Sequence, residues 1–138
     1  MKRTDKYPDT ETFHYYNANP HNKIAADCVI RAISTALNQS WEQTVRELTE
    51  VGIKYGLVCN EKACYDKYLK SKGWIKHSQP KKADNTKYTG KEFCERARDY
   101  EKYIANIGGH HIVAIVNKKV YDIWDSTYKC IGNYWTKG

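Results

Sequence analysis

The sequence predicts an α+β fold in which helices come first and an antiparallel sheet comes last. Two observations carry this prediction. From about residue 27 to 98, apolar residues recur at helical spacing between caps and stops, and after Tyr100 the spacing becomes strand-like, with runs rich in Val, Ile, Tyr and Trp. The length of 138 residues suits one ordinary domain. We expect a single domain over 1–138, made of an extended arm (1–20), a mainly helical half (27–98) and a β half (103–136).

The N-terminal arm is polar, rich in Tyr and interrupted by Pro8 and Pro20. Proline restricts its own residue and the one before it, so we expect an extended segment with at most one short strand near 13–16. The basic start is followed by no apolar segment, and no stretch approaches the length of a membrane span. A secretory signal and a transmembrane helix are therefore not expected.

Helix boundaries are marked by capping residues. The first helix should span about 27–38, with Asp27 as a candidate N-cap. A capping box at Ser40 opens the second helix, which Gly56 ends, and a third helix can run from Asn60 to Gly73. A second capping box opens a short helix over 89–98, whereas the aperiodic, basic stretch 74–88 is predicted to be a loop. The expected strands are 103–106, 112–116, 120–124 and 130–135.

The cysteines and the charge limit the classes of function. Five cysteines form neither an even framework nor a paired ligand pattern, so we expect a reduced, cytoplasmic protein without disulfides, a bound metal or another cofactor. The formal net charge of +7 permits attraction to nucleic acid or to an acidic protein. No nucleic-acid-binding motif accompanies the basic cluster at 81–91, which favours a solvated surface.

Cys28 occupies the position in this chain where a thiol ionises most easily. It follows Asp27 at the start of a predicted amphipathic helix whose apolar residues include Val29, Ile30 and Ile33. The free amides of a helix's first turn and the positive end of its dipole favour thiolate over thiol. The same position also suits a buried, inert cysteine, so a partner is needed to decide between these interpretations.

A histidine and an aspartate are candidates for that partner. If residues 117–119 form the loop of the hairpin, the register places His111 opposite Asp125, close enough for the carboxylate to orient the imidazole. A two-residue loop at 117–118 would instead pair His110 with Asp125. Asp122 is the alternative carboxylate if the hairpin is irregular.

The order Cys28, His111, Asp125 resembles that of the papain-like cysteine peptidases. The segment from His111 to Ser126 is most similar to the Josephin-type and bacteriocin-leader-cleaving branches, and the stretch from Asn19 to Ser34 resembles small papain-like proteins often encoded by bacteriophages. The resemblance implies a catalytic cysteine on a central helix packed against a C-terminal antiparallel sheet. It also implies an amide donor for the oxyanion six residues before the cysteine, which here is Asn22.

The resulting hypothesis is a papain-like cysteine protease that cleaves a peptide or isopeptide bond in a protein or peptide substrate. Cys28 would be the nucleophile, His111 the general base and then acid, Asp125 the orienting carboxylate, and Asn22 with the Cys28 amide the oxyanion donors. Transfer to an amine and deamidation use the same groups. The alternative is a non-enzymatic binding or inhibitor protein of phage type, acting on an acidic protein or nucleic acid.

Overall fold

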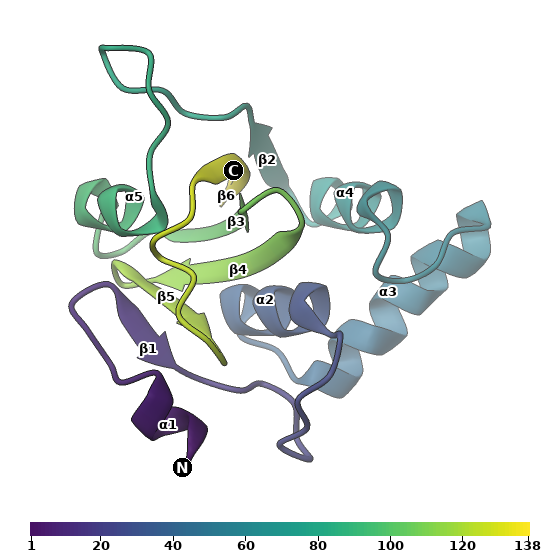
Figure 1. The fold of residues 1–138 in the computed structure, drawn as a ribbon. Helices are drawn as coiled ribbons and strands as arrows, with labels where there is room; N and C mark the ends of the chain where they lie inside the picture. The colour runs from purple at the N-terminus through teal and green to yellow at the C-terminus, as the bar shows by residue number, and fades with distance from the viewer.

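The computed structural model describes residues 1–138 and confirms the α+β prediction (Figure 1). All five helices precede the last four strands of the chain, and six strands form one sheet in the order β1-β5-β4-β3-β6-β2. The helices are α1 (Arg3–Lys6), α2 (Cys28–Leu37), α3 (Trp41–Tyr55), α4 (Lys62–Ser71) and α5 (Gly90–Arg96). The strands are β1 (Phe13–Tyr15), β2 (Trp74–His77), β3 (Lys102–Ile107), β4 (His111–Val116), β5 (Lys119–Asp122) and β6 (Ile131–Lys137).

The sheet is mixed, which corrects the expectation of a purely antiparallel sheet within 103–136. The predicted strand in the N-terminal arm forms as β1 and pairs in parallel with β5 at one edge. Residues 74–77, expected to belong to a loop, form β2 at the other edge, antiparallel to β6. An edge strand has only one neighbour and keeps exposed residues such as Ile75, so β2 lacks the apolar alternation that identifies a strand in sequence.

The predicted capping signals for two helices are present. The Ser40 hydroxyl accepts a hydrogen bond from the Gln43 amide at 3.0 Å, and Gly56 ends α3 in the left-handed conformation. At α5, the Thr89 side chain and Glu92 form a reciprocal capping box. None of the helices has the length and apolar composition needed to cross a lipid bilayer.

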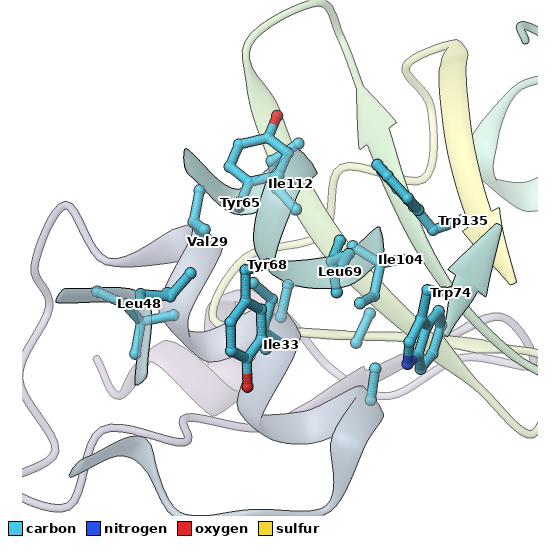
Figure 2. Close-up of a cluster of buried hydrophobic side chains, with 14 residues drawn as sticks. Val29, Ile33, Leu48, Tyr65, Tyr68, Leu69, Trp74, Ile104, Ile112 and Trp135 are labelled. Carbon is cyan, nitrogen blue, oxygen red and sulfur yellow. The ribbon is translucent and has the colours of Figure 1, made fainter. Parts of the chain in front are cut away.

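Two hydrophobic clusters lie on opposite faces of the sheet. The first packs α2, α3 and α4 against β3 and β4, with Ile33, Leu48 and Ile104 almost completely buried (Figure 2). The second lies between the opposite face and α5, around Phe13 and Cys94. Both faces of β4 are therefore covered, and the strand is held rigidly against α2. This packing fixes where the first residues of α2 and β4 meet.

Candidate active site

Cys28 and His111 meet where α2 and β4 begin. The Cys28 thiol interacts with the His111 imidazole and with the backbone amide of Ile112, and both interactions act on its pKa. Cys28 is only half-buried, and it packs against the edge of the first hydrophobic cluster. The sulfur is thus held between two donors while one side of it remains open to solvent.

The surroundings of Cys28 favour its thiolate. Burial alone raises the pKa of the thiol, but the hydrogen bonds from His111 and from the Ile112 amide act in the opposite direction. The positive charges of His111 and Arg31 add to that effect, and the pKa of Cys28 falls below its ordinary value. A thiol that is partly exposed and ionises easily has the properties of a nucleophile rather than those of a core residue.

The imidazole of His111 is held on its other side by a buried carboxylate. His111 Nε2 lies 2.5 Å from Asp122 Oδ2, and the Asp122 side chain is only 1% exposed. Burial disfavours the imidazolium, but the hydrogen bonds and charges of Asp122 and Cys28 outweigh burial and raise the pKa of His111 to about 9. The ring of Trp124 lies against the imidazole, with 4.9 Å between the ring centroids. The ring is therefore fixed in position and charged near neutral pH.

The carboxylate beside His111 is Asp122, and the expected pairing with Asp125 is wrong. Strands β4 and β5 are joined by the two residues Asn117 and Lys118, so Val116 pairs with Lys119 and regular pairing ends before residue 125 is reached. Asn117 and Lys118 have φ values of 55° and 65°, the left-handed pair of a tight hairpin turn. Asp125 lies in the following turn, where its Oδ1 accepts hydrogen bonds from the amide and hydroxyl of Thr127.

The other two candidate residues, His110 and Asn22, form no side-chain hydrogen bond with His111 or Asp122. His110 is exposed in the β3–β4 turn, after Gly108 and Gly109, which have positive φ values. Asn22 is exposed in the turn that begins at Asn19, and its side-chain oxygen accepts a weak 3.4 Å hydrogen bond from Asn17. The oxyanion role expected of Asn22 receives no support from these contacts. The Cys28 amide, at the first residue of α2, has no carbonyl partner within the helix.

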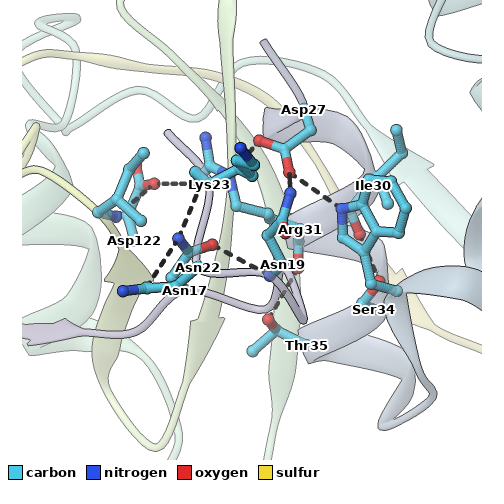
Figure 3. Close-up of polar contacts among 12 residues, drawn as sticks. Asn17, Asn19, Asn22, Lys23, Asp27, Ile30, Arg31, Ser34, Thr35 and Asp122 are labelled. Carbon is cyan, nitrogen blue, oxygen red and sulfur yellow. Dashed lines mark hydrogen bonds and ion pairs between the residues drawn. The ribbon is translucent and has the colours of Figure 1, made fainter. Parts of the chain in front are cut away.

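A buried arginine joins the site to the rest of the fold, and sequence reasoning did not identify it. Arg31 is 6% exposed and lies between two carboxylates, with Nε 2.8 Å from Asp27 Oδ1 and Nη1 2.5 Å from Asp122 Oδ1 (Figure 3). Its signal in the sequence was a single cation among the apolar residues of α2, four positions after an aspartate. Asp27 occupies the N-cap position of α2 but makes no capping hydrogen bond, because its carboxylate serves Arg31 instead.

No group of three or more potential ligands is arranged to hold a metal ion. Cys28 supplies a thiol that contacts the base His111, and His111 in turn contacts the carboxylate of Asp122, which orients it. This order of groups suits nucleophilic chemistry. Comparison of the chain with family models, with curated proteins and with solved structures found no match.

Proposed function

We propose that this chain is a papain-like cysteine hydrolase that cleaves a peptide or isopeptide bond through a thioester intermediate. The observation that carries the proposal is the continuous chain of contacts from the Cys28 thiol through His111 to the buried Asp122. These are the contacts of a nucleophile, a general base and an orienting group. A structural cysteine or a simple binding surface requires no such arrangement.

In the first half of the proposed reaction, the Cys28 thiolate attacks the carbonyl carbon of the scissile amide. The tetrahedral oxyanion forms beside the first turn of α2, where the Cys28 amide is free to donate. The imidazolium of His111 then gives its proton to the leaving amine, the C–N bond breaks and a thioester remains on Cys28. The raised pKa of His111 means that this proton is present near neutral pH.

In the second half, His111 is neutral and acts as a base toward water. The hydroxide equivalent attacks the thioester, the carboxylic acid leaves, and the Cys28 thiolate and His111 imidazolium are restored. Asp122 keeps the imidazole oriented in both halves through its 2.5 Å contact with Nε2. An amine in place of water would give transfer, so the acceptor decides between hydrolysis and transfer.

The direct test is cleavage of an unbiased substrate pool. The purified chain is incubated with a denatured proteome that includes lysine-branched peptides, and mass spectrometry records new termini and released branches. We expect products that disappear in Cys28→Ala and persist in the matched control Cys130→Ala, which removes an exposed cysteine instead. The same products from the wild type and from Cys28→Ala would refute the proposal.

A further inference from the structure

Arg31 places a permanent positive charge inside the fold, and the proposed reaction gives it no step of its own. We propose that Arg31 is a positioning residue that aims Asp122 at His111 and balances the charge around the Cys28 thiolate. This inference rests on the proposed function and adds a second requirement to it. Arg31 acts through Asp122 and does not touch the reacting atoms.

The two carboxylate oxygens of Asp122 bind different partners. Oδ1 accepts hydrogen bonds from Arg31 Nη1 at 2.5 Å and from the Ile123 amide at 2.8 Å. Oδ2 is left for His111. Rotation of the carboxylate would break the bonds to Oδ1 in a site with almost no solvent, where unpaired charges are expensive. Arg31 therefore selects the orientation in which Oδ2 faces the imidazole.

Arg31 is itself fixed from two sides of the fold. Its Nε donates to Asp27 Oδ1, while Asp27 Oδ2 accepts from Trp41 Nε1 on α3 at 2.9 Å and from Asn19 Nδ2 at 3.2 Å. Asp27 is 4% exposed, so this second carboxylate is as enclosed as Asp122. The guanidinium is planar and donates through a rigid fork, which suits it to hold two carboxylates at once. The N-terminal arm and α3 thus contribute to the orientation of Asp122.

The charged groups enclosed behind Cys28 balance one another. Asp27 and Asp122 carry two negative charges, and Arg31 with protonated His111 carries two positive charges. The thiolate of Cys28 then forms beside a balanced set of charges. Without Arg31 the set would be negative before the thiol ionised, and ionisation of Cys28 would become harder.

One further titratable group faces Cys28 from a packed element. Tyr65 on α4 interacts electrostatically with Cys28, and its pKa is raised to about 12 by burial, by Asp66 and by Cys28. The phenol stays neutral across the working range of pH. The groups that set the charge at Cys28 are therefore His111 and Arg31, with the two carboxylates behind them.

The test is the pH profile of Cys28 alkylation by iodoacetamide, read by mass spectrometry and needing no substrate. The double variant Asp27→Asn/Arg31→Met removes one charge of each sign, so the sum of the enclosed charges is unchanged and only the hold on Asp122 is lost. We expect its alkylation at pH 6 to be about tenfold slower than in the wild type, with an equal rate at alkaline pH where the thiol is ionised in both. The matched control is Glu42→Gln/Arg46→Met, which removes an exposed ion pair at the same helical spacing and should change neither rate.

Two further variants separate orientation from charge. Arg31→Met alone also leaves the enclosed set negative, so at pH 6 it should react more slowly than the double variant. Arg31→Lys keeps the positive charge but lacks the rigid fork, so its rate at pH 6 should lie between those of the wild type and the double variant. This variant also serves if the double variant does not fold. A folded double variant with the wild-type profile, or an Arg31→Lys variant that matches the wild type, would overturn the role of Arg31 alone. A wild-type Cys28 that reacts only at alkaline pH would overturn the proposed function as well.

Discussion

Two cysteines on opposite faces of the same sheet differ in what surrounds the sulfur. Cys94 on α5 is completely buried in the second cluster, and burial raises its pKa to about 12. Burial acts in the same direction on Cys28, yet the pKa of Cys28 is lowered because His111 and the Ile112 amide donate to its sulfur. A helix and a partly apolar environment are common to both residues. The histidine beside Cys28, held by its own carboxylate, makes the difference.

Removal of His111 should have the largest effect on the difference in reactivity between Cys28 and Cys94. In His111→Ala, Cys28 loses its donor and the adjacent positive charge while burial remains, so it should come to resemble Cys94. We expect alkylation of Cys28 at pH 6 to slow roughly 100-fold, and cleavage of any substrate to fall by several orders of magnitude. Time courses of labelling and cleavage measure both effects. Unchanged labelling in a folded variant would show that His111 does not control the thiol.

The next largest effect on Cys28 labelling is expected from substitution of Asp122, and substitution of Asp125 should have none. Asp122→Asn leaves His111 without its anion and Arg31 with one partner, so we expect about tenfold slower labelling of Cys28 at pH 6 and a loss of about 3 kcal/mol in the free energy of unfolding. Asp125→Asn is the control. Its Oδ1 still accepts from Thr127, so labelling should not change and the stability loss should stay below about 1 kcal/mol. Equal effects of the two variants would contradict the assignment of Asp122.

The raised pKa of His111 also predicts how stability depends on pH. Because the folded-state value of about 9 lies above the ordinary value of 6.5, protonated His111 stabilises the fold fully below about pH 6.5, and this contribution is lost as the pH rises through about 9. The shift corresponds to a contribution of about 3 kcal/mol. Cys28 titrates with the opposite sign, so urea unfolding between pH 6 and 10 is followed in a Cys28→Ala background, where the loss should appear with His111 and not with His111→Gln. Parallel curves for the two proteins would argue against the shift.

The smallest effect is expected at the second cysteine. Cys94→Ala removes a buried sulfur from the second cluster and should cost about 1 kcal/mol of stability through the space it leaves. It should leave the labelling of Cys28 unchanged, since the two residues lie on opposite faces of the sheet. Chemical denaturation and peptide mapping measure these two quantities. A change at Cys28 would mean that the two faces are coupled through β4.

The regular elements were predictable because their signals are local. Ser40, Gly56 and Thr89 mark helix ends through hydrogen bonds with residues no more than four positions away. The partner of His111 was not predictable in this way, since it depends on the length of one turn. Lys118 adopts a left-handed conformation usually filled by glycine, and the sequence gives no sign of it. The two-residue loop was one of the alternatives, but it was expected to pair His110 with Asp125; Asp122, the alternative carboxylate for an irregular hairpin, is the one that reaches His111.

Arg31 could not be placed from the sequence because its partners are distant along the chain. Asp122 lies 91 residues away, and Trp41 and Asn19 reach the same network from separate segments. The i,i+4 spacing from Asp27 fits an ion pair on a helix, but such spacing is also common on exposed surfaces and gives no sign of burial. The strand β2 was missed for a related reason, since it depends on pairing with β6 at the far end of the chain.

The most direct test of the difference between the two cysteines is an NMR pH titration of the chain labelled with ¹³C at the cysteine β-carbons. The chemical shift of that carbon reports whether each sulfur carries a proton. We predict that Cys28 titrates below the ordinary thiol pKa of 9.0 and moves above it in His111→Ala, while Cys94 stays protonated throughout the accessible range in both proteins. A Cys28 signal that titrates at or above the ordinary value in the wild type would contradict the account.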